Sequence, residues 1–261
     1  MKPSDPGTAE PASEADLRAL DLRHALNEVG SLVAGALTLE DLLERVASSA
    51  IQAVSRGDGA GVMLLGMGPA RDQVQALAAS EAFVAEIDAI QYEATNEGPC
   101  ITAAAERQPV RTGNTGGDPR WPRFGPRAGR LGVHSVLSLP LLLPDQTVVG
   151  TLNLYSHSKD AFDDDAVRLG GLFAGPAGVA VHNAQVLERA QARAAQLQVA
   201  LISRATIDQA IGILRSRSGD TADEAFARLR AISQAENLKL SVVAERIVEE
   251  AVRRARVRHH R

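Results

Sequence analysis

The hydrophobic repeat of this chain changes period twice, and that change limits the folds it can adopt. In the first 53 or so residues the apolar positions recur every three or four residues, which is the spacing of one helix face. Between residues 60 and 156 short apolar runs and alternating residues indicate strands. From Asp163 onward helical spacing returns and continues to the end. Strands confined to one block and followed only by helices predict an α+β fold.

The N-terminal third predicts a tail, two helices and a hairpin. Residues 1–16 are polar and proline-containing, which predicts a disordered tail. Thr38 and Asp41 resemble a capping box, with Asp in place of Glu, at the start of the second helix. The first helix is predicted from a single apolar stripe, Leu22, Leu26, Val29, Val33 and Ala36. The runs 60–65 and 74–78 then predict a β-hairpin.

Two stronger strands follow near the middle of the chain. In 135–143, alternate leucines share one face, and 147–156 alternates in the same way. Only three residues, 144–146, separate the two runs, and Asp145 and Gln146 among them form a tight connection. Such a short connection predicts that the strands pair antiparallel.

The helix after Asp163 carries an approximate heptad seam. Its first members, Phe173 and Ala180, also fit a helix that packs on its own domain. Beyond about residue 185 no sheet partner remains, so we expect a partner helix and a homodimer. The predicted dimer seam consists of Asn183, Leu187, Ala190, Ala194, Leu197 and Leu201, in which Asn183 would fix the register.

The last 60 residues predict three helices. Residues 218–220 end the first helix, and Thr221 with Glu224 forms a capping box for the second. Ser241 is predicted to cap the third. Phe226, the one aromatic residue here, falls on the apparent core stripe, which excludes base stacking on aromatic side chains as the main mode of nucleic-acid binding.

The distribution of charge also divides the chain, near residue 191. The first 191 residues hold 15 basic and 24 acidic residues, whereas the last 70 hold 13 and 8. The C-terminal part is therefore suited to a polyanion. The alternative is a solvated basic tail, because five arginines lie in the last nine residues, at positions 253, 254, 256, 258 and 261.

Catalytic and metal-binding motifs are absent from the sequence. It has no phosphate loop, hydrolase elbow, zinc-protease motif or kinase signature, and its six histidines lack metal-ligand spacing. A single cysteine, Cys100, excludes an intramolecular disulfide and a multi-cysteine zinc site. Cys100 is either a redox-sensing thiol at a helix start or a small buried hydrophobe. We expect no enzyme activity and no metal.

Neither a membrane span nor a secretion signal is expected. No apolar run approaches the roughly 18 residues of a span, and the N-terminus lacks a basic-then-apolar signal. A cytoplasmic protein without a membrane partner is the prediction.

Residues 201–249 resemble the ANTAR domain, an RNA-binding three-helix module of bacterial transcription antiterminators. The matching positions are Arg204, Ile207, Ala210, Gly212, Leu214, Glu224–Phe226, Leu229, Arg230, Asn237, Leu240, Val243, Ala244, Ile247 and Val248. Ile211 and Arg215 depart from the family pattern, which commonly has Lys and Met there.

Residues 20–185 resemble a GAF domain. The similarity rests on the segments 97–100, 118–122 and 135–141, which are typical of GAF domains fused to ANTAR in actinobacteria. The two resemblances imply a GAF sensor or dimerisation domain (17–185), with an antiparallel sheet and flanking helices. A coiled-coil-like linker helix (186–200), a three-helix ANTAR bundle (201–256) and a basic tail (257–261) would follow.

The resemblance implies a transcription antitermination regulator. A dimeric ANTAR domain would bind paired stem-loops in nascent RNA and prevent terminator formation, while the GAF domain senses a signal or mediates dimerisation. No cofactor is implied beyond a small-molecule GAF ligand. The residues implied to contact RNA are Arg204, Gln209, Arg215, Arg230 and Lys239, together with Ala210 and Gly212, which either admit a loop base or pack between helices.

Other functions remain open from the sequence. Leu240–Ala251 could be the recognition helix of a DNA-binding regulator. The chain could also be a redox-sensing GAF protein or a protein-interaction adaptor. A GAF-type methionine sulfoxide reductase is disfavoured, because that chemistry cycles several cysteines and this chain has one.

Overall fold

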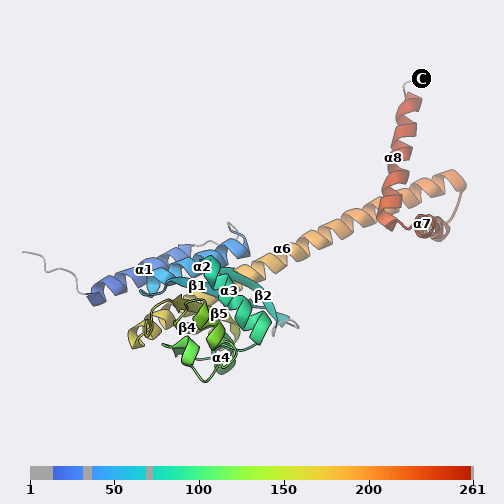
Figure 1. Cartoon of the computed structure of the whole chain (residues 1–261). Coiled ribbons are helices and arrows are strands. Elements are labelled where there is room, and N and C mark those ends of the chain that lie inside the picture. The colour runs from blue at the N-terminus through green and yellow to red at the C-terminus, as the bar shows by residue number, and fades with distance from the viewer. Residues whose placement is uncertain (1–13, 32–36, 69–72, 260–261) are drawn as a thin grey trace, which may run out of the picture. The chain divides into compact units, whose positions relative to one another are not determined.

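The computed structural model describes residues 14–31, 37–68 and 73–259, without the side chains of 15, 258 and 259 (Figure 1). The chain divides into two compact units, residues 1–188 and 189–261. Val33 and Ala36, predicted to extend the first helical stripe, lie outside the described residues. The predicted tail overlaps the first helix, α1, which spans Glu14–Ser31.

A five-stranded antiparallel sheet forms the centre of the first unit. Its strand order is β2-β1-β5-β4-β3, so the two predicted hairpins are neighbouring pairs. The strands are β1 (Gly59–Leu65), β2 (Val74–Ala79), β3 (Val110–Thr112), β4 (Ser135–Leu142) and β5 (Val148–Ser156). The predicted α+β fold with an antiparallel sheet and flanking helices is confirmed.

One face of the sheet is covered by α1, α2 (Leu39–Ala53) and the first part of α6 (Asp164–Ser218). The leucines that alternate along β4 point to this face and belong to one large apolar core. The predicted capping box begins α2, because the Thr38 hydroxyl accepts from the Asp41 N–H at 3.1 Å. The alternation in the strands and the three-to-four spacing in the helices each place apolar side chains on one face. The sheet and the helices bury these faces against each other.

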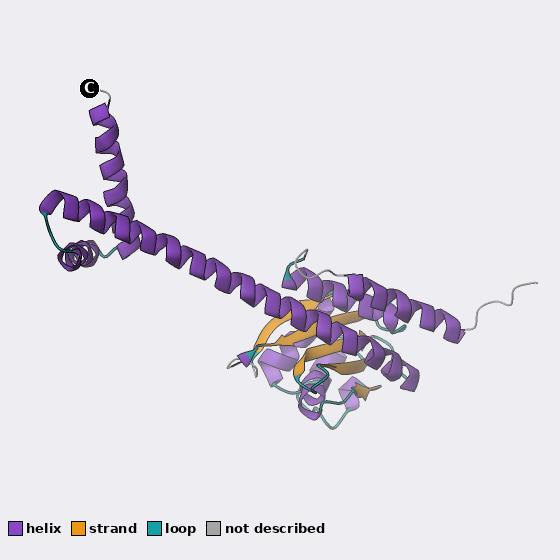
Figure 2. Cartoon of the chain, turned by 180° about the vertical axis from the view of Figure 1, so that it is seen from behind, coloured by secondary structure: helices purple, strands orange, loops and turns teal. Residues whose placement is uncertain are grey.

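The opposite face is covered by shorter elements (Figure 2). These are α3 (Ala82–Ala89), the π-helical turn η2 (Ile90–Thr95), α4 (Pro99–Glu106), η3 (Thr115–Gly117) and α5 (Gly125–Arg130). Trp121, Phe124 and Tyr155 are the large side chains of the second core on this side. Both faces of the sheet are therefore buried, although only one face looked apolar in the sequence.

The start of α6 is fixed by acidic residues. The Asp163 carboxylate accepts the Ala166 N–H at 2.8 Å, as expected for acidic groups at a helix N-terminus. Arg111 of β3 pairs with Asp164 at 2.6 Å, and Arg18 of α1 pairs with Asp165 at 3.2 Å. The first turn of α6 is thus held by cations from two other elements.

The second unit is a three-helix core. The end of α6 packs with α7 (Ala222–Glu236) and α8 (Leu240–His259) around four buried residues: Ala210, Leu229, Val243 and Ala244. The predicted capping box at Thr221 and Glu224 begins α7. Asn237, at a φ of 52°, ends it. Ser241 does not cap the third helix as predicted, because α8 already begins at Leu240.

By length and composition alone, α6 could also cross a membrane, since one 18-residue window has a mean hydropathy of 1.2. This differs from the sequence analysis, which found no such run. Ile207, Ala210 and Leu214 contribute to the apolar character of α6, and all three belong to the three-helix core. Only 6% of that window is buried, so the match is not that of a buried core helix, and a single helix of this kind is weak evidence of a span.

The small core of the second unit should be sensitive to cavities. Replacing the fully buried Leu229 by Ala should lower the free energy of unfolding of this unit by about 2–5 kcal/mol. Leu238→Ala is the matched control, because that side chain is 38% exposed. Urea unfolding followed by circular dichroism measures both. Equal effects of the two substitutions would contradict the assigned core.

Candidate functional site

A row of polar side chains lies on the second face of the sheet, beneath α3, η2 and α4. Thr151, Asn153 and Tyr155 alternate along β5 and are fully buried. Ser138 of β4 is the register partner of Asn153, and Gly61 of β1 lies opposite it on the other side. Polar groups in the middle of a sheet that is buried on both faces need hydrogen-bond partners, so this row is a candidate site.

The π-helical turn brings further polar groups to the row. The buried Asp88 lies in the last turn of α3, and Gln91 lies in η2. The Tyr155 hydroxyl donates to Asp88 Oδ1 at 2.5 Å, and the Gln91 amide donates to the Tyr155 oxygen at 2.9 Å. A π-helical turn inside a helix often occurs at a functional site. We call this cluster the polar chamber: Asp88, Gln91, Tyr92, Cys100, Ser138, Thr151, Asn153 and Tyr155.

Burial raises the pKa of Asp88 to about 7, against the opposing effect of hydrogen bonds from Tyr155 and Gln91. The side chain is only 1% exposed, and desolvation disfavours its charged form. Its second oxygen, Oδ2, approaches the β1 backbone so closely that a Cβ at Gly61 would lie 2.6 Å away. Glycine at position 61 is therefore required by the approach of the carboxyl group.

Cys100 lies inside the polar chamber. Its thiol contacts the hydroxyls of Tyr92 and Thr151, the latter at 2.5 Å, and it is fully buried. Burial, with a contribution from Asp88, raises the pKa of this thiol to about 12. The position at the start of α4 does not activate the thiol, because desolvation outweighs the helix N-terminus. The structure thus favours the buried alternative over the redox-sensing one.

Several polar atoms of the chamber have no hydrogen-bond partner. These buried atoms are Asp88 Oδ2, Asn153 Oδ1, Asn153 Nδ2 and Ser138 Oγ. Leaving such groups unpaired costs about 1–3 kcal/mol each. Both donors and acceptors are available, so the chamber could satisfy them on a small polar molecule.

The motif 97–100 builds one wall of the chamber. The Glu97 carboxylate accepts the backbone N–H groups of Arg123 and Phe124, the latter at 2.8 Å. A Cβ at Gly98 would lie 2.2 Å from Gln91 Oε1, so only glycine fits there. That oxygen accepts the Cys100 N–H at 3.2 Å. The motif therefore orders the chamber wall.

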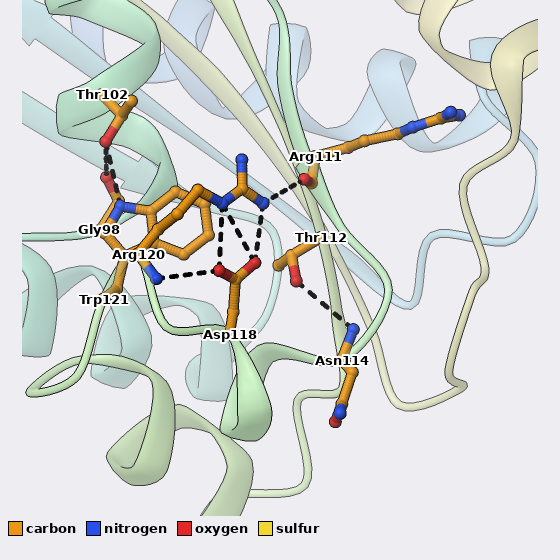
Figure 3. Close-up of polar contacts among 8 residues, drawn as sticks. All are labelled: Gly98, Thr102, Arg111, Thr112, Asn114, Asp118, Arg120 and Trp121. Carbon is orange, nitrogen blue, oxygen red and sulfur yellow. Dashed lines mark hydrogen bonds and ion pairs between the residues drawn. The ribbon is translucent and has the colours of Figure 1, made fainter.

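The motif 118–122 ties the adjoining loop to the same wall (Figure 3). The Arg120 guanidinium pairs with Asp118 at 2.7 Å and lies over the Trp121 ring, 4.2 Å from its centroid. The Trp121 indole donates to Thr102 of α4 at 3.0 Å, and Thr102 donates to the Gly98 carbonyl at 3.0 Å. The loop and α4 are thereby fixed to each other.

A separate hollow of about 990 Å³ lies beside α4 in the same unit, next to α6. Ile101 and Arg107 line it from the α4 side, and His182 and Gln185 line it from α6. His182 Nδ1 and Gln185 Oε1 are buried and have no partner. A molecule bound in this hollow would contact α6 directly.

In the second unit, most predicted RNA-binding residues are exposed. Arg204, Gln209, Gly212 and Arg215 are exposed on α6. The spacing of Arg204, Gly212 and Arg215 places them on one face of the helix, and nothing lies within 4 Å of a Cβ built at Gly212. Ala210 differs, because its side chain is fully buried in the three-helix core. Ala210 is therefore a packing residue, and Gly212 leaves room for close approach.

Two other predicted residues lie on other elements. Arg230 is exposed on α7, and Lys239 is exposed just before α8. The structure does not gather all the predicted residues on one helix. The interpretation of Phe226 as a core residue was wrong, because its side chain is 41% exposed and lies outside the apolar core.

The predicted seam is largely exposed on α6. Leu197 and Leu201 are 61% and 68% exposed, Asn183, Ala190 and Ala194 are exposed, and Leu187 is half-buried. The earlier pattern members differ, since Phe173 is buried in the first core. The outward apolar residues there are Leu172, Val179 and Val186, which recur every seven residues. Sequence periodicity missed this neighbouring row.

No cluster of three or more metal-ligating side chains occurs in the part of the chain that the structure describes. The two candidate sites are thus the buried polar chamber and the exposed helical surface that carries cations.

Comparisons with known proteins agree with the two units. A family model described as GAF domain matches residues 36–182, and one described as ANTAR domain matches residues 195–248. Both are sensory and regulatory domains rather than catalytic ones, and they are typically soluble. Comparison with curated proteins finds no match.

Solved structures are similar only at low identity. The GAF domain from Acinetobacter phosphoenolpyruvate-protein phosphotransferase is 16% identical, with a TM-score of 0.49, over 68% of this chain and 99% of that one. Free methionine-R-sulfoxide reductase from Neisseria meningitidis is 19% identical, with a TM-score of 0.48, over 69% and 97%. TM-scores and identities this low carry no information about activity.

The raised pKa of Asp88 predicts a pH-dependent stability. An aspartate in an unfolded chain has a pKa of about 3.9, so between there and about 7 the native state binds more protons. The free energy of unfolding should therefore fall as the pH rises across this interval. Relative to Asp88→Asn, the wild-type protein should lose thermal stability between pH 5 and 8. Parallel profiles for the two proteins would contradict the assignment.

Proposed function

Because the chain belongs to the GAF domain family and carries an ANTAR domain, we propose that it is a dimeric RNA-binding regulator of transcription antitermination. Two ANTAR modules bind paired stem-loops in nascent RNA, and a competing terminator hairpin then does not form. The GAF domain senses a signal or holds the dimer together. The protein acts in the cytoplasm, where nascent transcripts are.

The observation that carries this proposal is the exposed face of α6 within the ANTAR match. Arg204 and Arg215 lie on this face with Gly212, which leaves the backbone open. Cations on an open helix surface suit the phosphates of a folded RNA. Asp208 lies on the same helix, and its carboxylate repels phosphate. It therefore restricts where the RNA backbone can lie and favours one position of the RNA.

The exposed seam supports dimerisation. Residues 188–202 of α6 have no buried side chain, yet they include Leu197 and Leu201. Large apolar residues at helical spacing on an unpacked helix are stabilised when a second copy covers them. Two RNA-binding modules held together bind two hairpins with an avidity that neither module has alone.

Sensing is assigned to the GAF domain. A small polar molecule in the polar chamber would satisfy Asn153, Ser138 and Asp88, while a ligand in the hollow would contact His182 and Gln185 of α6. Either ligand acts only if it binds two arrangements of the protein with different affinity. The same helix that is fixed at Asp163–Asp165 continues into the ANTAR core.

The direct test of function is binding to RNA hairpin pairs compared with duplex DNA. Hairpin RNA should bind more tightly, and each lost phosphate contact should reduce the salt slope by about 0.7–0.9. Arg204→Gln/Arg215→Gln should therefore weaken binding and lower the slope by roughly 1.4–1.8. Preference for duplex DNA would favour the alternative DNA-binding function, with α8 as the recognition helix.

Disrupting the seam should separate the two copies. Leu197→Asp/Leu201→Asp places charges at the contact, so the protein should sediment as a monomer and bind hairpin pairs more weakly. Leu131→Asp is the control, because Leu131 is an exposed leucine, 41% exposed, that does not belong to α6. Analytical ultracentrifugation and RNA titration measure both effects. A double variant that still sediments as a dimer would show that other surfaces carry the interface.

A further inference from the structure

Phe226 is the one aromatic residue of the ANTAR unit, and it is not used by the core. Its side chain is 41% exposed, whereas its neighbours Ala225 and Leu229 are fully buried. The core of this unit consists of other side chains. The exposed ring is therefore available for contact with a partner, and its neighbours on α7 decide which kind of partner fits it.

The ring lies in a row with two polar side chains. Arg230 follows Phe226 by four residues and Gln234 by eight, so the three share one face of α7. All three are exposed. Ala227 and Ala231, which lie between them in the sequence, have short side chains that do not project far from the helix. Among the described residues, no carboxylate pairs with Arg230. The row therefore offers a flat apolar ring next to an uncompensated cation.

This chemistry fits an unpaired nucleobase and the phosphate beside it. Bases in hairpin loops are unstacked and bind by stacking on aromatic rings, while arginine pairs with the backbone. A protein partner is less well matched, because Phe226 is flanked by small residues rather than by an apolar patch. The net basic charge of the last 70 residues also favours RNA.

We propose that Phe226 stacks on an unpaired base of the bound stem-loop and that Arg230 holds the adjoining phosphate. This inference rests on the proposed function, RNA binding by the ANTAR domain. It adds a stacking contact on α7 to the cationic face of α6. It also reverses the expectation that stacking on aromatic side chains plays no main part here.

The test uses the full-length protein and a two-hairpin RNA selected from a pool with randomised loops. Phe226→Leu keeps an apolar side chain but removes the ring, and it should weaken binding roughly 5- to 150-fold with an unchanged salt slope. Phe226→Tyr keeps the ring and should bind like wild type. Arg230→Gln should lower the salt slope by about 0.7–0.9. Melting curves establish that each variant is folded.

A fluorescent variant reports stacking directly. In Phe226→Trp the new indole is exposed, whereas the native Trp121 is buried in the other unit. Hairpin RNA should quench this fluorescence, and RNA with abasic loop positions should not. Leu238→Trp, at a half-exposed site of the same unit, is the control and should show no such quenching.

The outcomes separate the two proposals. If wild-type protein binds no selected RNA, the proposed function fails. If wild type binds RNA but Phe226→Leu binds equally well, or loop bases leave the Phe226→Trp emission unchanged, the stacking proposal is overturned. A Phe226→Leu variant that changes sedimentation but not RNA affinity would assign the ring to a protein contact, which also overturns it.

Discussion

Packing of α6 on the sheet is the constraint on which the rest of this protein depends. Phe173, Ala177 and Val181 of that helix complete the first core, and Ala210 of the same helix lies in the three-helix core. One helix therefore supplies buried residues to both units. In the proposed function, a change in how α6 packs in the GAF domain would act on RNA binding through this covalent connection.

The two faces of the sheet are stabilised by different interactions. The apolar face of the sheet is stabilised by burial alone, which is not directional. The chamber instead depends on hydrogen bonds among Asp88, Tyr155 and Gln91, and it leaves both polar atoms of Asn153 unpaired. Directional interactions in a low-dielectric site are strong when complete and destabilising when incomplete. The stability of this face is therefore expected to depend on the protonation of Asp88, whereas that of the apolar face is not.

The sequence predicted those elements whose causes are local. The capping boxes at Thr38 and Thr221 depend on residues three positions apart, and the β4–β5 pairing depends on a short connection. Burial is not local. The alternation along 147–156 does not show what covers the side of Thr151 and Asn153, which the elements from α3 to α5 bury. For the same reason the sequence leaves two alternatives for Cys100, because its position at a helix start says nothing about desolvation.

The wrong placement of Phe226 and the overlooked row that begins at Leu172 have one physical origin. Adjacent residues on a helix lie about 100° apart, so a broad apolar stripe leaves the choice between neighbours open. Phe173 is buried while Leu172 is exposed, and Ala225 is buried while Phe226 is half-exposed. A large residue at the edge of a stripe is the one that sequence periodicity places least well. Such a residue can contact a partner without removing a side chain from the core. Residues at the edges of apolar stripes are therefore where we expect this helical module to bind its partners.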